Sequence, residues 1–373
     1  MKIAVLAHIR HAIAEPFRGG MEAHCHSLCR GLRRAGHEVV LFAAAGSDDP
    51  QLVAICDAPY EQVLPWEVHR GSAALADYQR RAFEKAWDII EAGDFDVVHN
   101  NSLFPEVIGW AAEAGLACVT SQHVPPFGIM RDAVSAAAWA DHALFTVTSR
   151  HQLTLWDRAA TPNLRVVGNG VDTHYWRPVD GIDDYFTWIG RIVPTKGLAE
   201  AIAAAKLAGV RLRIFGPVED VAYFADRIEP QLGGGIEYHG FRRSDGLRDQ
   251  LARSRAAVVT PMWDEPFGLV AAEALACGVP VLAFDRGAMR DVVGDCGIVV
   301  PPADVAALAQ AFRDHGRIDR EDCRAHAVAR LSIEAMIVGY EACYGDARAA
   351  VRMPALSAAA RSSSQSRTAA LLA

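Results

Sequence analysis

Two carboxylates eight positions apart, Glu265 and Glu273, flank the start of an apolar helical segment. Gly268 and Leu269 stand between them, and most of the neighbouring residues are alanine, leucine or valine. Eight residues span slightly more than two helical turns, which puts both acids on one side of the helix. A carboxylate within an apolar helix is costly unless it is paired or directed at a ligand. Because carboxylates accept hydrogen bonds from hydroxyls, the spacing favours a site for sugar and ribose hydroxyls over a merely solvated Glu273.

Positive charge is expected in the same half of the chain, at Arg191 and Lys196. Gly190 and Arg191 follow a strand-like run at residues 185–189, and Gly197 after Lys196 begins the next helical segment. Two cations and a helix N-terminus at the carboxyl end of one strand suit a diphosphate. Such a pair is usually two solvated surface charges. The place of this pair at the end of a strand instead favours an anion-binding site.

A glycine pair, Gly19 and Gly20, follows the first strand-like run after a loop and opens a helical segment. Backbone amides and the positive end of the helix dipole can face an anion there, and a residue without a side chain lets it approach. Such pairs are also common in simple turns, so an anion-binding role for these glycines depends on support from the other motifs.

Two histidines stand at the ends of strand-like runs, His99 at the end of 97–99 and His123 just after 117–121. The carboxyl ends of parallel strands meet at one edge of a sheet, so both imidazoles should face an interdomain cleft. A structural histidine is the alternative at each position. Four further histidines lie between residues 8 and 26 without the spacing of a zinc site, so no metal is expected.

The elements that must position these residues alternate between short apolar runs and helical stretches, which predicts parallel α/β sheets. Strand-like runs are expected at residues 3–7, 39–42, 97–99, 117–121 and 143–147, and again at 185–189, 212–215, 236–238, 257–260, 279–283 and 298–300.

The two series of strands predict two Rossmann-like domains in a chain of 373 residues. A Pro-, Asp- and Gly-rich stretch separates the series. We expect one domain at 1–177, a second at 178–340, and a C-terminal helix returning toward the first domain with a flexible tail at 341–373.

Composition limits the partners and the compartment. The formal net charge is −8, so attraction to nucleic acid is not expected from the whole molecule. No apolar run is long enough for a signal peptide or a transmembrane span, and peripheral membrane contact has no support. The eight cysteines form no regular framework, which is typical of a reducing cytoplasm. Nothing in the composition indicates the oligomeric state.

The segment from Glu265 to Pro280, together with Arg191 and Lys196, resembles the retaining glycosyltransferases of family 4, which have the GT-B fold. The resemblance extends from Met1 to about Tyr344. It implies two Rossmann-like domains facing an interdomain cleft, with the acceptor bound by the domain at 1–177 and the nucleotide sugar by the domain at 178–340. It also implies transfer of a hexosyl unit from a nucleotide-diphosphate sugar, with a UDP-sugar favoured, to a hydroxyl acceptor without a metal or other cofactor.

The resemblance also implies roles for single residues in donor binding. Glu265 would contact the transferred sugar and Glu273 the ribose. The donor set is completed by the residues that would line the sugar and the phosphates: Gly19, Gly20, Gly190, Arg191, Lys196, Phe267, Gly268 and Leu269. His123 would stand beside the reacting sugar, so the catalytic set is His123, Arg191, Lys196 and Glu265.

Acceptors bind after the first strand in this fold, which assigns Arg10, His11 and Arg18 to the acceptor, with His99 shaping its pocket. Asp291 departs from the family pattern, where relatives usually carry Pro-Glu, and this leaves the identity of the donor open.

Two other functions share these features: a GT-B-like sugar-nucleotide epimerase, and a sugar-nucleotide-binding protein without turnover. The intact set of Arg191, Lys196 and the two glutamates argues against the second. A dinucleotide-dependent dehydrogenase is disfavoured, because neither domain begins with Gly-x-Gly-x-x-Gly after its first strand.

Overall fold

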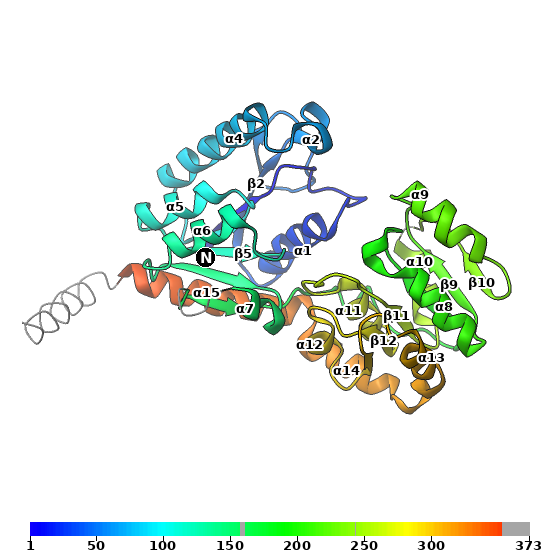
Figure 1. Cartoon of the computed structure of the whole chain (residues 1–373). Helices are drawn as coiled ribbons and strands as arrows, with labels where there is room; N and C mark the ends of the chain where they lie inside the picture. Colours follow the sequence, from blue (N-terminus) through cyan, green and yellow to red (C-terminus); the bar gives the residue numbers. More distant parts are fainter. Residues whose placement is uncertain (157–160, 243, 353–373) are drawn as a thin grey trace, which may run out of the picture.

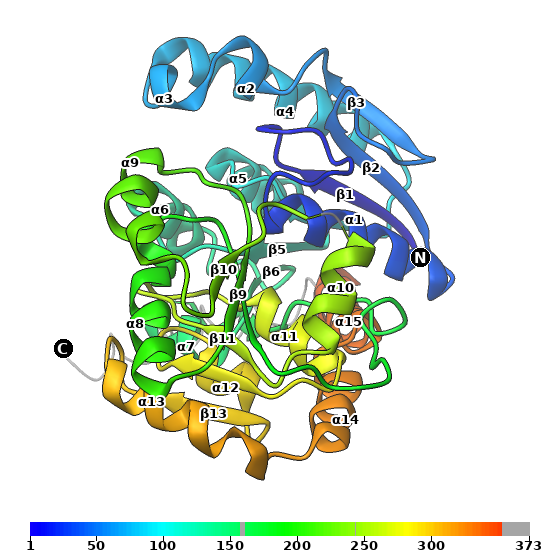
Figure 2. The ribbon, with the colours of Figure 1, turned by 90° about the vertical axis from the view of Figure 1, so that its right-hand side faces the viewer.

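The computed structural model describes residues 1–156, 161–242 and 244–352. Within these residues the chain forms two α/β units, each built on one parallel sheet (Figure 1). Figure 1 shows the blue and cyan elements of the first unit beside the yellow and orange elements of the second, and the two units overlap in the perpendicular view of Figure 2. The predicted α/β class with two Rossmann-like units is therefore confirmed.

The first unit contains a seven-stranded parallel sheet. Its strands, in spatial order, are β3 (Leu52–Cys56), β2 (Glu38–Ala44), β1 (Lys2–Ala7), β4 (Val97–Asn101), β5 (Cys118–Gln122), β6 (Ala143–Val147) and β7 (Leu164–Val166). Its helices are α1 (Gly20–Arg34), α2 (Tyr60–Val63), α3 (Trp66–His69), α4 (Ala73–Ala92), α5 (Pro105–Ala114), α6 (Gly128–Ala136) and α7 (Arg150–Leu155).

The second unit contains a six-stranded parallel sheet. Its strands, in spatial order, are β10 (Ile236–Tyr238), β9 (Leu212–Phe215), β8 (Phe186–Ile189), β11 (Ala257–Val259), β12 (Val281–Phe284) and β13 (Gly297–Val300). The α-helices that follow β8 in the chain are α8 (Leu198–Ala208), α9 (Val221–Tyr223), α10 (Ser244–Ala252), α11 (Leu269–Ala276), α12 (Met289–Val293), α13 (Val305–Asp314), α14 (Arg320–Arg330) and α15 (Ile333–Arg352). Four short helical segments of other types are η1 (Pro194–Lys196), η2 (Phe224–Ile228), η3 (Glu229–Gln231) and η4 (His315–Arg317).

Both faces of the first sheet are buried, which explains why its strands read as continuous apolar runs. Along β1, Ile3 and Val5 belong to one hydrophobic cluster, while Ala4 and Leu6 belong to another. Successive side chains of a strand point to opposite faces, so the two clusters lie on opposite sides of the sheet. Helices α1 and α15 cover the first face, and α4 and α5 cover the second.

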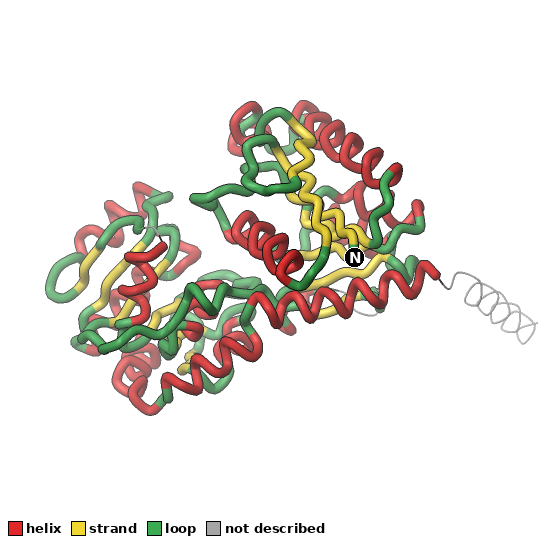
Figure 3. The backbone as a smooth tube through the Cα atoms, turned by 180° about the vertical axis from the view of Figure 1, so that it is seen from behind, coloured by secondary structure: helices red, strands yellow, loops and turns green. Residues whose placement is uncertain are grey.

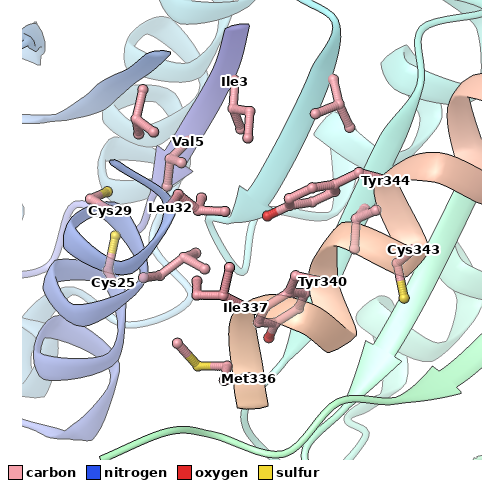
Figure 4. Packing of buried hydrophobic residues seen from close by; sticks show 14 of the residues in the cluster. Ile3, Val5, Cys25, Cys29, Leu32, Met336, Ile337, Tyr340, Cys343 and Tyr344 are labelled. Atoms are coloured by element: carbon pink, nitrogen blue, oxygen red, sulfur yellow. The ribbon is translucent and has the colours of Figure 1, made fainter. Parts of the chain in front are cut away.

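Helix α15 returns to the first unit and completes its core. Figure 3 shows it along the first sheet, and it contacts α1 and β5. Figure 4 shows Ile337 and Tyr344 of this helix on the side that faces Leu32 and Cys25 of α1. The helix begins eight residues before position 341, and the expected tail at 353–373 lies outside the described residues. No helix in the described part of the chain is long and apolar enough to cross a bilayer.

The strand order creates one switch point in each sheet. The chain runs outward from β1 through β2 to β3 and then returns to β4 on the other side of β1. It does the same in the second sheet, from β8 through β9 to β10 and back to β11. Ligands of open α/β sheets bind at the carboxyl ends of the strands beside such a point. The loops after β1, β4, β8 and β11 are therefore the places for functional side chains.

Candidate active site

Lys196 and Glu265 meet at the switch point of the second sheet. Lys196 ends the short helical segment after β8, and Glu265 stands in the loop after β11. Lys196 Nζ donates a hydrogen bond of 2.6 Å to Glu265 Oε2, and Trp263 Nε1 donates one of 2.9 Å to the same oxygen. The ammonium also lies 5.2 Å from the centre of the Trp263 ring. Two residues singled out from the sequence thus form one charged pair, and Trp263 is a partner that the sequence did not indicate.

The position of Lys196 is fixed by the glycine that follows it. Gly197 has φ of +67°, and a Cβ there would lie 2.0 Å from the Thr260 carbonyl oxygen. Any side chain would therefore push the loop after β8 away from the loop after β11. The Thr260 hydroxyl donates to the Gly197 carbonyl oxygen at 2.9 Å, which joins the two loops a second time.

Arg191 lies in the same loop as Lys196 but has a different partner. Its guanidinium donates a hydrogen bond of 2.8 Å to Glu219 and is about half exposed. Gly190 is needed beside it, because a Cβ would lie 2.9 Å from the Trp188 ring. The two predicted cations therefore stand at one strand end, and each is neutralised by a carboxylate of the protein itself.

Helix α11 carries the second acid of the motif. Gly268 precedes the helix with φ of +90°, where a Cβ would lie 2.2 Å from Met289 Cε. Glu273 is half-buried in an apolar helix, and burial raises its pKa to about 8. No hydrogen bond joins its side chain to another described residue. The group is thus a carboxyl whose environment favours the protonated form at neutral pH.

The Phe267 ring belongs to the core rather than to a ligand surface. It is 4% exposed and packs in the same cluster as Ala272 and Met289. A Cβ at Gly168, in the first unit, would lie 3.3 Å from this ring. The Phe267 ring is therefore stabilised by the neighbouring core, and the assignment of this residue to the donor set stays a prediction.

The glycine loop of the first unit faces the segment from Glu265 to Glu273 in the second unit. A Cβ at Gly20 would lie 3.4 Å from Leu269 Cδ1, so the starts of α1 and α11 approach each other across the two units. Gly19 is in extended conformation before the helix. Glu22 in the first turn of α1 is buried, and the sequence considerations above did not single it out.

His123 is buried at the carboxyl end of β5. Its Nε2 lies 3.0 Å from Asn101 Oδ1, and its ring centre is 4.2 Å from that of His24 on α1. Burial lowers its pKa to about 4, so the imidazole is neutral at pH 7. Asn101 ends the neighbouring strand β4, which places both polar groups beside the switch point of the first sheet.

His99 does not line a pocket, which corrects its assignment to the acceptor. It is 0% exposed, and its Nδ1 and Nε2 lie 2.5 Å from the Tyr344 hydroxyl and 3.0 Å from Ser121 Oγ. Tyr340 of the same helix accepts a hydrogen bond from Ser121 at 3.1 Å. Burial lowers the pKa of His99 to about 3, so the ring is a neutral part of the polar contact between β4 and α15.

The loop after β1 lines a cavity on the first unit. The cavity has a volume of about 370 Å³, and its walls include His11, Arg18, Pro59 and Glu61. Arg10 donates a hydrogen bond of 2.8 Å to Glu61, so this arginine holds the wall rather than projecting into open space. Among the described residues no carboxylate pairs with the exposed Arg18. His11 and Arg18 thus line one hollow, and Arg10 contacts it only through Glu61.

Comparison with protein-family models shows to which enzyme family the chain belongs. The model of the group 1 glycosyl transferases matches residues 183–315, and that of glycosyltransferase family 4 matches residues 18–175. The chain is a family 4 glycosyltransferase. The two matches fall on the two sheets, so the enzyme assignment covers both halves of the molecule.

Known relatives of this glycosyltransferase differ in what they make. It is 27% identical to the glycogen synthase of Mycobacterium tuberculosis, over 79% of this chain and 82% of that protein. It is 28% identical to the MMP α-(1→4)-mannosyltransferase of Mycolicibacterium hassiacum, over 83% and 87%. Sucrose-phosphate synthase of Thermosynechococcus elongatus has a similar structure, with a TM-score of 0.76 at 20% identity over 94% and 100%. The GT-B fold is confirmed by these likenesses.

A structure that contains ligands is also similar. The structure of Anabaena HepE in complex with UDP and glucose superposes on the structure of this chain with a TM-score of 0.68. The two sequences are 19% identical, over 92% of this chain and 99% of HepE. Likeness at this level of identity establishes the shared fold.

Two contacts join the units of the glycosyltransferase beside the Glu265 loop. The Thr148 hydroxyl donates a hydrogen bond of 2.7 Å to the Pro266 carbonyl oxygen. Asp291 accepts hydrogen bonds from the backbone amides of Arg150 at 2.9 Å and His151 at 3.3 Å, at the start of α7. The residue that departs from the family pattern therefore caps a helix of the opposite unit, a role that only the tertiary structure could reveal.

Proposed function

We propose that the chain is a retaining hexosyltransferase that uses a nucleotide-diphosphate sugar, with a UDP-sugar favoured, and a hydroxyl acceptor. The observation that carries this proposal is the 2.6 Å contact of Lys196 with Glu265 at the switch point of the second sheet. A cation and a sugar-directed carboxylate at one strand end can hold a phosphate and a hexose of the same molecule. The HepE complex with UDP and glucose supports the choice of donor.

In the proposed donor site the protein's own ion pairs are exchanged for ligand contacts. Lys196 and Arg191 turn from Glu265 and Glu219 toward the diphosphate, and Glu265 becomes free to accept hydroxyl hydrogen bonds from the sugar. Glu273 meets the ribose. The charge that grows on the leaving diphosphate is then stabilised by two cations that the fold already places at one edge.

The acceptor is proposed to enter from the first unit, through the cavity lined by His11 and Arg18. Its hydroxyl approaches the anomeric carbon on the face that the diphosphate leaves, and a phosphate oxygen takes the hydroxyl proton, so the configuration is retained. His123 stands beside the sugar as a neutral imidazole. Closure of the two units would exclude water from this reaction.

Metal independence is part of the proposal and rests on Lys196 and Arg191, which supply the positive charge that a divalent ion supplies elsewhere. In the portions of the chain that the structure describes, no three His, Cys, Asp or Glu side chains are grouped as ligands.

The test is to incubate the protein with UDP-sugars and GDP-sugars, with and without hydroxyl acceptors, and to measure release of the nucleoside diphosphate. A transferase releases UDP in proportion to the glycosylated product. An epimerase returns a changed sugar nucleotide without an acceptor, and a binding protein returns its ligand unchanged. Either of the last two outcomes contradicts the proposal.

A further inference from the structure

Glu22 is a buried carboxylate that no step described above uses. It is 4% exposed in the first turn of α1, and its Oε1 lies 3.4 Å from His8 Nε2. His8 follows β1, and its Nδ1 accepts a hydrogen bond of 3.3 Å from the Arg10 amide. Because that amide requires a lone pair on Nδ1, the neutral ring carries its proton on Nε2, facing Glu22. One oxygen of the carboxylate therefore lies beside the Nε2–H of His8.

The second oxygen of Glu22 is free. No described residue donates to Oε2. This oxygen is not fully buried, so a ligand can reach it. A Cβ at Gly19 would lie 3.1 Å from this oxygen, so glycine leaves the approach to it open. A charged oxygen in a side chain that is almost wholly buried costs free energy unless a donor meets it. The arrangement is that of a prepared hydrogen-bond acceptor.

The place of Glu22 indicates which substrate meets it. The carboxylate lies between the cavity of the first unit and the motif of the second. His11 lines that cavity, and the Glu22 charge raises the pKa of His11 against the larger lowering by burial. On the other side, Gly20 faces Leu269. A carboxylate there repels a diphosphate and attracts a hydroxyl, so it fits the polyol that enters from the first unit.

We propose that Glu22, oriented by His8, accepts a hydrogen bond from a hydroxyl of the acceptor and thereby selects a polyol acceptor. The assignment rests on the proposed transferase function. It makes Glu22 a substrate-binding residue, and the proton of the reacting hydroxyl still passes to the donor phosphate. His8 is a positioning residue, since it acts through Glu22.

The test compares Glu22→Gln and Glu22→Asp with wild type. Glu106→Gln is the matched control, because Glu106 holds a first-turn place on α5 and pairs with Arg80 away from the site. Each protein is assayed for UDP binding, for hydrolysis of UDP-glucose, and for transfer to glucose, myo-inositol and their phosphates. Crystals of each are also soaked with UDP and glucose.

The loss of one hydrogen bond to a charged group changes a binding or rate constant by a factor of about ten to a hundred. Glu22→Gln should therefore lower kcat/KM for the acceptor by about this factor. UDP binding and hydrolysis should stay within about twofold of wild type, with partial recovery in Glu22→Asp. Equal losses in hydrolysis and transfer would contradict the acceptor role. So would a wild-type protein that binds UDP yet transfers to none of the acceptors and shows no hydroxyl at Glu22 in the crystal. A wild-type protein that binds no nucleotide overturns the proposed function instead.

Discussion

Lys196 and Glu265 are 69 positions apart in the chain, yet their charged atoms lie 2.6 Å from each other. The pair joins the loops that follow β8 and β11, the two strands that flank the switch point of the second sheet. An ammonium bound to a carboxylate can exchange that partner for a phosphate oxygen at little change in net hydrogen bonding. In the proposed donor site this pair holds the cation ready for the diphosphate.

Replacing Lys196 with alanine should lower kcat/KM for sugar transfer by roughly a hundredfold to a thousandfold, since one preorganised charge contact is lost in the transition state. The measurement is steady-state release of UDP from the best UDP-sugar. Lys206→Ala serves as control, because Lys206 is an exposed cation in the last turn of α8. Undiminished turnover in Lys196→Ala would refute the role given to the ammonium.

Replacing Glu273 with glutamine should flatten the pH dependence of stability. The folded-state pKa is about 8 against an ordinary 4.5, so between these values the native protein holds a proton that the unfolded chain has released. Stability of the wild type should therefore fall as pH rises from about 4.5 toward 8, and Glu273→Gln removes this contribution. Urea unfolding of both proteins at a series of pH values measures it. Parallel curves for the two would show that Glu273 ionises normally.

Replacing Tyr344 with phenylalanine should lower the free energy of unfolding by about 1 to 3 kcal/mol, because His99 Nδ1 loses its buried partner. The Michaelis constant for any acceptor should stay unchanged, since His99 lies beneath α15 and away from the cavity. Denaturant unfolding and acceptor kinetics on the same sample separate the two effects. A raised acceptor KM at unchanged stability would restore His99 to the acceptor pocket.

Replacing Asp291 with alanine should destabilise the fold by about 1 kcal/mol, since two amides at the start of α7 lose their acceptor. Asp285→Ala is the control, because Asp285 forms an ion pair with the exposed Arg290 in the same segment. The difference between the two variants in urea midpoint checks the prediction. Equal midpoints would mean that the contact between the units contributes no stability.

Much of the fold could be predicted from the sequence, because apolar runs and glycines act locally. The pair Gly19 and Gly20 was expected to open a helical segment, and α1 runs Gly20–Arg34, while the expected strands fall on the two sheets. Lys196 and Glu265 were both assigned to one donor from the sequence, and they meet because residues at neighbouring strand ends share one edge of a sheet.

The environment of each histidine could not be predicted from the same rule. Both His99 and His123 stand at strand ends, but α15, from the far end of the chain, covers His99. One signal was present: side chains two apart on a strand share a face, and Val97 belongs to the cluster under α15. Partners such as Trp263 and Glu219 depend on loop conformations, which carry no periodic pattern.

The most direct test of the donor site is a crystal structure of the protein with UDP. The account predicts that Lys196 Nζ leaves Glu265 for a phosphate oxygen, that Arg191 leaves Glu219 for the same diphosphate, and that the Glu273 carboxyl meets the ribose hydroxyls. A nucleotide bound elsewhere, or bound while Lys196 keeps its present contact with Glu265, would contradict it.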